Sequence, residues 1–249
     1  MREACAIARE EIDALLWDRR TRGRTAELAT RSIRLGARES AAIEGAEVPV
    51  DIVLGGGGVE RSPLGAVLGS ALRVTAEAAQ QRSAWHTAPL QALAALHLVA
   101  ARDVLDDALL GRPRSTAEAD DPLHIGELPP ASEALARLEA LATVITSPTK
   151  APGLLVAAVV HGELMALRPF AWGSGLVARA AVRLVVSDRG VDPGNLVAYE
   201  HGLRSLGRGA YVAALRGYAS GTSEGLAEWL VWHAGAVGFA ATQARAYLD

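Results

Sequence analysis

The residue types best suited to bind a ligand are concentrated in one short stretch. Residues 167–179 read L-R-P-F-A-W-G-S-G-L-V-A-R. Gly173 and Gly175 permit backbone angles with positive φ, so several N–H groups can point outward where a helix begins. Such groups bind anions with the help of the helix dipole, and Arg179 lies one turn into that helix. The candidate residues of this anion nest are Arg168, Gly173, Ser174, Gly175 and Arg179.

Two apolar segments flank this stretch and must position it. Leu154–Leu167 and Leu176–Asp188 are rich in helix-forming residues, which predicts two helices joined by a short loop. Pro169 lacks a backbone donor and ends the first helix, and Phe170 can anchor the loop in the core. The alternative is a glycine-rich helix corner that binds nothing, because an isolated G-x-G is common.

The rest of the chain also favours helices, so we predict an all-α fold. A long polar connection is expected from Gly111 to Pro130, and Ser132 is expected to cap the helix that follows it. Residues 1–60 are predicted to form an N-terminal helical extension with a glycine-rich linker, and residues 61–249 a helical domain. The further predicted helices are Glu3–Arg19, Thr25–Ile43, Leu64–Gln81, Ala88–Leu110, Ser132–Ile145, Gly207–Tyr218 and Glu224–Tyr247.

One segment invites a different interpretation. Val48–Leu54 alternates in part between apolar and polar residues, as a strand does, and Gly55–Gly58 follows it. In a G-x-G-x-x-G dinucleotide fingerprint that starts at Gly55 or Gly56, the third glycine would fall on Glu60 or Arg61. Both registers fail, so Gly55–Gly58 is interpreted as a linker. A nicotinamide-dependent oxidoreductase is therefore only a distant alternative.

Composition excludes several classes of function. The chain has 249 residues and a formal net charge of −3, which indicates neither a nucleic-acid surface nor an electrostatic membrane anchor. The single cysteine, Cys5, excludes an internal disulfide and a cysteine-rich zinc site. The longest apolar run, Leu154–Val160, is too short to span a bilayer. We therefore expect a soluble, cytoplasmic protein that binds no nucleic acid, membrane or metal.

The stretch resembles the signature of the Fic (Fido-domain) family, H-P-F-x-[D/E]-G-N-[G/K]-R-x-x-R. The same register here gives R-P-F-A-W-G-S-G-L-V-A-R. A second motif lies upstream: Ser40-Ala41-Ala42-Ile43-Glu44-Gly45 matches the [S/T]-x-x-x-E-[G/N] helix end with which some Fic proteins inhibit themselves. The resemblance implies a Fic/Fido-like helical core. It also implies an inhibitory segment with Ser40, Glu44 and Gly45, and a salt bridge between Glu44 and Arg179.

The departures from the signature bear on function. In an active member the loop histidine is the general base, the acidic residue holds magnesium, and the asparagine and two arginines bind phosphates. Those positions are here Arg168, Trp172, Ser174, Leu176 and Arg179. Arginine stays protonated at physiological pH, so Arg168 cannot serve as a base. Trp172 offers no oxygen to magnesium, which demands oxygen ligands.

No other residue is expected to replace the missing base. His161 precedes Arg168 by seven residues, which places it roughly 10 Å away along a helix, so we expect a core histidine there. Glu163 is expected to be structural. His97, His201 and His233 lie on separate segments without metal-site spacing.

The leading hypothesis is a catalytically degenerate Fic-like protein that acts as a binding or regulatory module. It requires no cofactor and could hold ATP or another nucleotide without magnesium. An unidentified protein partner is expected, and a homodimer is compatible with the sequence. The alternative is a Fic-fold transferase of altered chemistry that transfers a nucleotidyl or phosphoryl group to protein.

Overall fold

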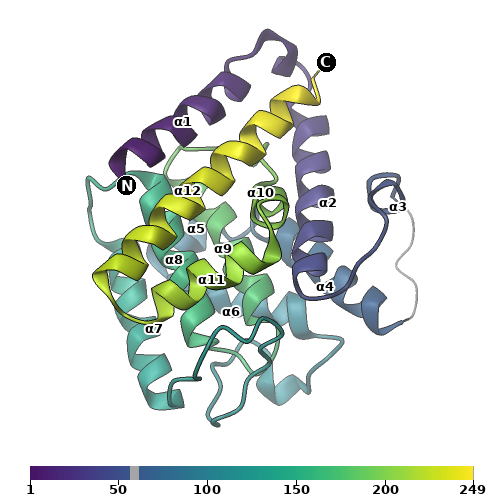
Figure 1. Cartoon of the computed structure of the whole chain (residues 1–249). Coiled ribbons are helices and arrows are strands. Elements are labelled where there is room, and N and C mark those ends of the chain that lie inside the picture. Colours follow the sequence, from purple (N-terminus) through teal and green to yellow (C-terminus); the bar gives the residue numbers. More distant parts are fainter. Residues whose placement is uncertain (57–61, 249) are drawn as a thin grey trace.

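The computed structural model describes residues 1–56 and 62–248, and within these ranges it contains helices and no strand (Figure 1). The all-α prediction is confirmed. The elements are α1 (Arg2–Leu16), η1 (Arg19–Thr21), α2 (Thr25–Ile43), α3 (Val50–Leu54), α4 (Pro63–Glu77), α5 (Arg82–Thr87), α6 (Pro89–Ala101), η2 (Asp107–Leu109), α7 (Ala131–Thr146), α8 (Gly153–Leu167), α9 (Ser174–Asp188), α10 (Tyr199–Ser205), α11 (Arg208–Ala219) and α12 (Ser223–Ala246).

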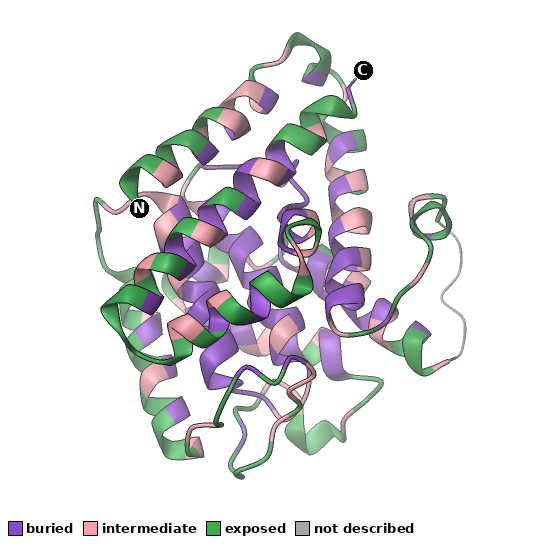
Figure 2. Cartoon of the chain, in the orientation of Figure 1, coloured by how far each residue is buried: buried purple, intermediate pink, exposed green. Residues whose placement is uncertain are grey.

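Helix α9 is the centre of the molecule. Its residues from Leu176 to Ser187 are buried without interruption, because helices lie on every side of it. Helix α8 packs beside α9, and α2, α4, α5 and α6 also contact α9. The central helices are the most buried part of the chain, whereas α1, α11 and α12 each present an exposed outer face (Figure 2).

Helix α2 joins the N-terminal segment to this centre. It has the predicted bounds and packs against α4, α10 and α9. Ser32, Gly36, Ser40 and Glu44 follow one another at intervals of four residues, so they lie on one side of α2 and its C-terminal end. This row, here called the α2 stripe, lies over α9.

The ends of the chain are paired. Helix α1 runs alongside α12, so the two terminal segments lie next to each other (Figure 1). Cys5, Ala8, Ile12 and Leu15 recur at a helical interval on α1 and are buried. The predicted N-terminal helices therefore pack onto the helices of the predicted C-terminal domain, while a boundary at residue 60 stays a prediction.

Several local predictions were wrong. The segment interpreted as partly strand-like forms helix α3, because the period-2 pattern is too short to outweigh a helix that follows Pro49. Pro130 occupies the N-cap of α7 instead of Ser132. Helix α6 ends at Ala101, well before Leu110. The predicted linker Gly55–Gly58 lies partly outside the described residues.

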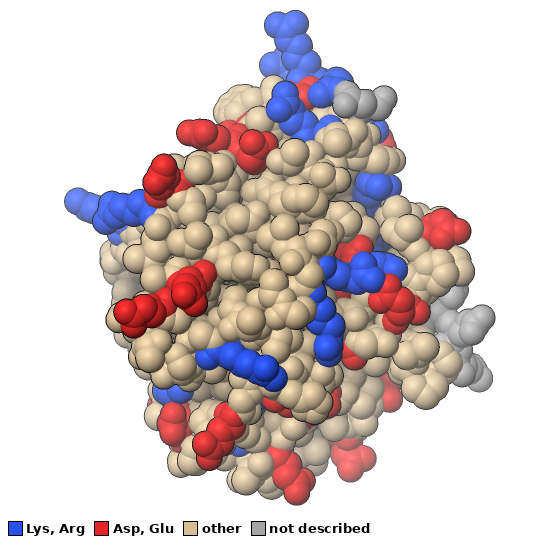
Figure 3. Space-filling view, viewed as in Figure 1, with Lys and Arg blue, Asp and Glu red and all other residues tan. Residues whose placement is uncertain are grey.

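Charged side chains of both signs occur on the face of the molecule drawn in Figure 3. On the face drawn in Figure 3, basic and acidic side chains lie around a broad area with few charges. Within the ranges 1–56 and 62–248, no helix is both long enough and apolar enough to cross a membrane.

Candidate functional site

The loop between α8 and α9 is held by hydrogen bonds among its own residues and by a ring contact with α6. Arg168 ends α8 with a left-handed backbone, φ 42°, and Gly173 precedes α9 with φ 74°. The hydroxyl of Ser174 accepts a hydrogen bond from the Phe170 N–H at 3.1 Å and donates to the Phe170 carbonyl at 3.2 Å. The buried Phe170 ring stacks on His97 with 4.0 Å between ring centroids. The loop frame is thus a rigid part of the core.

The Arg168 side chain points away from the expected nest. Its guanidinium is 3% exposed and donates to Asp121 Oδ2 at 2.8 Å. It also donates to the Gly126 carbonyl at 3.2 Å and the Glu127 carbonyl at 2.6 Å. The residue at the base position therefore anchors the connection between α6 and α7 and does not line the cavity at the start of α9.

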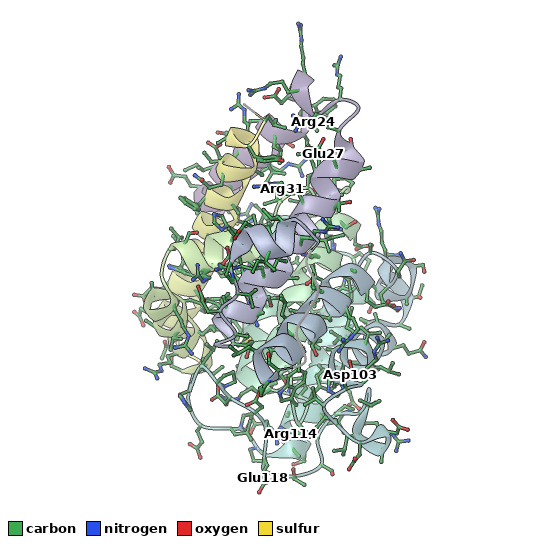
Figure 4. The ribbon with its side chains drawn as sticks, turned by 90° about the vertical axis from the view of Figure 1, so that its right-hand side faces the viewer. Arg24, Glu27, Arg31, Asp103, Arg114 and Glu118 are labelled. Carbon is green, nitrogen blue, oxygen red and sulfur yellow. The ribbon has the colours of Figure 1, made fainter. Side chains whose placement is uncertain are left out.

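Arg114 was not identified from the sequence, although it holds the same connection from the other side. Its N–H donates to the Pro169 carbonyl at 2.8 Å, and its Nε donates to the Arg168 carbonyl at 3.0 Å. Two further bonds reach the carbonyls of Thr116 and Pro129, at 2.7 and 2.5 Å. Figure 4 labels Arg114 at the lower end of the molecule. Hydrophobic periodicity does not reveal a buried arginine in a loop. The one sequence signal for Arg114 was its position directly after Pro113.

Arg179 is fully buried and bonded to the end of α2. Its Nε donates to Ser40 Oγ at 2.7 Å, and Nη2 donates to the Ser40 carbonyl at 3.3 Å. Nη2 also forms an ion pair with Glu44. Burial alone lowers the pKa of Arg179, but the charges and hydrogen bonds of Glu44 and Tyr211 together outweigh burial and raise that pKa above its ordinary value. Ser40, Glu44 and Arg179, which the resemblance brings together, are in contact.

A second buried arginine, Arg183, repeats this arrangement one turn further along α9. It pairs with Glu200 of α10 through bonds of 2.8 and 2.7 Å. It also donates to the hydroxyl and the carbonyl of Ser32, both at 3.1 Å. Gly36 allows this approach, since a Cβ there would overlap the guanidinium of Arg183. Sequence reasoning missed this pair because Arg183 lies in an otherwise apolar helix with its partners far away in sequence.

A small cavity of about 130 Å³ lies at the start of α9. Glu44 and Asp120 supply two carboxylates to it, and Trp172 and Leu176 form much of its apolar wall. The Glu44 carboxylate occupies the space that a side chain on Gly175 would need. Desolvation, together with Glu44 and Asp121, raises the pKa of Asp120. Gly173 therefore lines an acidic cavity and Gly175 lies against the Glu44 carboxylate, which disfavours a phosphate while Glu44 stays in place.

The side chains of the loop offer little to magnesium, which requires oxygen ligands. Trp172 supplies no oxygen, and Glu44, the carboxylate nearest Gly175, is paired with Arg179. Across the part of the chain that the structure describes, no group of three His, Cys, Asp or Glu residues could hold a metal ion.

His161 lies behind Arg179 in a buried polar chain. His161 Nε2 is 2.8 Å from Tyr211 Oη, and His161 Nδ1 is 3.1 Å from His233 Nε2. Burial lowers the pKa of His161 well below its usual range and that of His233 to about 3. Burial also raises the pKa of Tyr211 to about 12, although the charge of Arg179 opposes this. His161 thus lies in the core as a neutral, hydrogen-bonded histidine.

Glu163 also has structural partners. It accepts bonds from Arg137 of α7 at 2.8 and 3.0 Å, and Tyr218 Oη donates to it at 2.8 Å. These contacts tie α7 and α11 to α8. Glu163 therefore connects helices and does not take part in the loop.

Comparison with known proteins identifies the fold. No known protein-family profile matches the sequence, and no curated protein is significantly similar to it. A Fic family protein from Desulfovibrio desulfuricans G20 matches with a TM-score of 0.73 and 20% identity, over 98% of this chain and 74% of that one. Fic-1 (residues 134–508) from C. elegans matches with a TM-score of 0.66 and 15% identity, over 100% and 73%.

A Glu-to-Gly variant of the same C. elegans fragment matches with a TM-score of 0.67 and 14% identity, over 98% of this chain and 72% of that one. The class is therefore all-α, built around a buried helix hairpin. In particular, the chain has the Fic fold. The resemblance inferred from the loop is confirmed at the level of the fold.

Proposed function

We propose that this Fic-fold protein does not transfer AMP and acts as a binding or regulatory module. The observation that carries the proposal is that the Arg168 guanidinium is engaged in structural hydrogen bonds at the position of the family's base. A residue in the base position must accept a proton, whereas Arg168 is permanently protonated and its guanidinium is bonded to Asp121 and two carbonyls. The side chain supports the loop and leaves no base beside the nest.

Nucleotide binding in this proposal depends on Glu44. The cavity at the start of α9 measures about 130 Å³, below the roughly 300 Å³ at which ligand pockets usually begin. Displacing Glu44 would remove one carboxylate and release Arg179, which could then bind a phosphate. ATP or another nucleotide would bind without magnesium, through Arg179 and the N–H groups near Gly173, Ser174 and Gly175.

The test is an AMP-transfer assay with labelled ATP, run on the wild type and on Glu44→Gly, with an active Fic protein as the positive control. We expect no label on either protein or on added cell extract, with or without magnesium. Label that depends on the purified protein would overturn the proposal. Calorimetry on the same samples should detect magnesium-independent nucleotide binding only in Glu44→Gly.

The rival function is a transferase of altered chemistry on the same fold. It would need tight, magnesium-dependent nucleotide binding that weakens in Arg179→Ala. If the protein is a binding module, a pull-down should recover a protein partner, and binding of that partner should not require nucleotide. The two functions therefore give opposite results in the binding assay.

A further inference from the structure

A second hollow, separate from the α8–α9 loop, lies between α2, α10 and α12 and measures about 300 Å³. Leu28 and Leu35 of α2 supply one apolar wall, and Ala240 and Tyr247 of the α12 segment supply the opposite wall. Its size falls within the range of small-molecule sites, whose walls are mostly apolar with a few polar groups. We call it the α2–α12 hollow.

Among the charges of the described residues that line the hollow, Arg31 is the one without an ion-pair partner. Its guanidinium stacks on the ring of Tyr247, 3.5 Å from the ring centroid. Glu27, one turn away, is close enough for Arg31 to lower its pKa, but the carboxylate of Glu27 is bonded to Arg24. Figure 4 labels Arg24, Glu27 and Arg31 along α2. Among the described residues, no carboxylate lies within ion-pair distance of Arg31.

The other charges around the hollow are matched to one another. Glu39 is paired with Arg38 at 3.0 Å, with His201 at 3.2 Å and with Arg204 at 3.4 Å. Arg38 is also bonded to Glu47 and to the Val48 carbonyl. Within the described part of the chain, a ligand therefore meets two apolar walls, a set of paired charges, and one cation, Arg31, that no carboxylate holds.

We propose that the α2–α12 hollow binds a small amphiphilic monoanion, with a carboxylate or sulfonate on Arg31 and an apolar body between the two walls. Arginine suits this task because its flat guanidinium can stack on Tyr247 and still bond to a carboxylate or sulfonate with two donors. This assignment does not depend on the absence of AMP transfer.

The hollow shares residues with the contacts that hold α2. Ser32 lines it and accepts both bonds from Arg183, and Glu39 lines it directly before Ser40. On α10, His201 lines it directly after Glu200, the partner of Arg183. The hollow therefore adjoins the contacts that hold α2 against α9 and α10.

The probe for the test is 1-anilinonaphthalene-8-sulfonate, and its matched control is N-phenyl-1-naphthylamine, which lacks the sulfonate. Both are titrated by fluorescence into the full-length protein. Arg31→Gln should weaken binding of the sulfonate about tenfold, because a bond to a charged group contributes that much. Binding of the uncharged amine should stay unchanged, which shows that the hollow is intact.

Ala244→Phe places a ring in the hollow and should abolish binding of both probes. Arg82→Gln, which removes an exposed arginine of α5, is the control and should bind both probes as the wild type does. Circular dichroism and melting confirm that each variant is folded. Equal sulfonate binding in the wild type, Arg31→Gln and Ala244→Phe would overturn the proposal, as would equal losses of both probes in Arg31→Gln.

Discussion

Arg168, Arg179 and Arg183 each carry a positive charge into the interior, and each is matched by a carboxylate from a distant segment. Their partners are Asp121, Glu44 and Glu200. Because a buried ion pair gains little over an apolar pair but leaves an unmatched charge when one partner is removed, such residues are hard to replace singly. At the scale of single residues, ion pairs thus hold Arg168 at the end of α8 and Arg179 and Arg183 within α9.

Arg168→Ala should lower the free energy of unfolding by about 2 to 3 kcal/mol, because two loop carbonyls and Asp121 lose their donor. This loss is smaller than for a fully buried ion pair, because Asp121 keeps some contact with water. Urea denaturation followed by circular dichroism measures the change. Arg112→Ala, on the same connection but exposed, should change stability little. Equal effects of the two substitutions would contradict the anchoring role.

His97 predicts a pH dependence. Burial lowers its pKa to about 4 from the usual 6.5, so between these values the unfolded chain binds a proton that the folded chain does not. The contribution of neutral His97 to the free energy of unfolding is therefore fully present above pH 6.5 and is lost as the pH falls towards 4. His97→Gln should reduce the slope of stability against pH by up to about 1.4 kcal/mol per pH unit.

The measurement is urea denaturation at intervals from pH 4 to 7. Glutamine can still accept the bond that Gly111 N–H donates to His97 Nδ1 at 2.9 Å. The matched control is His86→Gln, which removes an exposed histidine. If the free energy of unfolding of His97→Gln depended on pH as steeply as that of the wild type, the folded wild type would already bind the proton on His97, which contradicts the prediction.

At the scale of elements, α2 is held to α9 by the α2 stripe. Ser40 and Glu44 engage Arg179, and Ser32 engages Arg183. Gly36 lies between them, where the side chains of Arg183 and Glu200 lie against the backbone of α2. The segment of residues 40–45 is thus continuous with a helix that supplies part of the core. A movement that frees Arg179 must involve the end of α2 near Glu44, because Ser32 stays bonded one turn beyond Gly36.

Gly36→Ala tests this packing, because the sign of its change in the free energy of unfolding shows whether a Cβ fits there. A Cβ at Gly36 would overlap Arg183 and Glu200, so we expect a loss of about 1 to 3 kcal/mol in the free energy of unfolding. Gly235→Ala is the matched control, since no atom lies within 4 Å of its added Cβ. There alanine should stabilise α12 by about 0.5 to 1 kcal/mol. Thermal melting of both variants measures the two signs; stabilisation in both would refute the close approach.

Much of this framework could be predicted from the sequence, and the reasons differ between elements. Helix α2 has the predicted bounds, and the α8–α9 hairpin was found because its apolar segments and Pro169 mark both ends. Helices α5 and α10 were missed, since neither is long enough to show a period. Arg114 and Asp121 were missed as partners of the loop because only the fold brings them to Arg168.

At the scale of the whole molecule, the N-terminal helices pack against helices from the rest of the chain. Helix α1 packs along α12, and α2 fills the groove between α4, α9 and α10. Leu28, Ala37, Ala41 and Ile43 of α2 belong to the same core as α9. Residues of α2 therefore supply part of this core, and the boundary at residue 60 stays a prediction.

Residues 61–249 expressed alone should not fold as a cooperative unit. Removing α2 leaves the buried Arg179 without Glu44 and Ser40, takes both Ser32 acceptors from Arg183, and uncovers apolar surface on α4 and α10. Thermal melting and amide hydrogen exchange of this fragment, with residues 1–249 as control, provide the test. We expect a broad transition and weak protection in α9. A sharp transition with α9 protected as in the full chain would show instead that residue 60 is a true domain boundary.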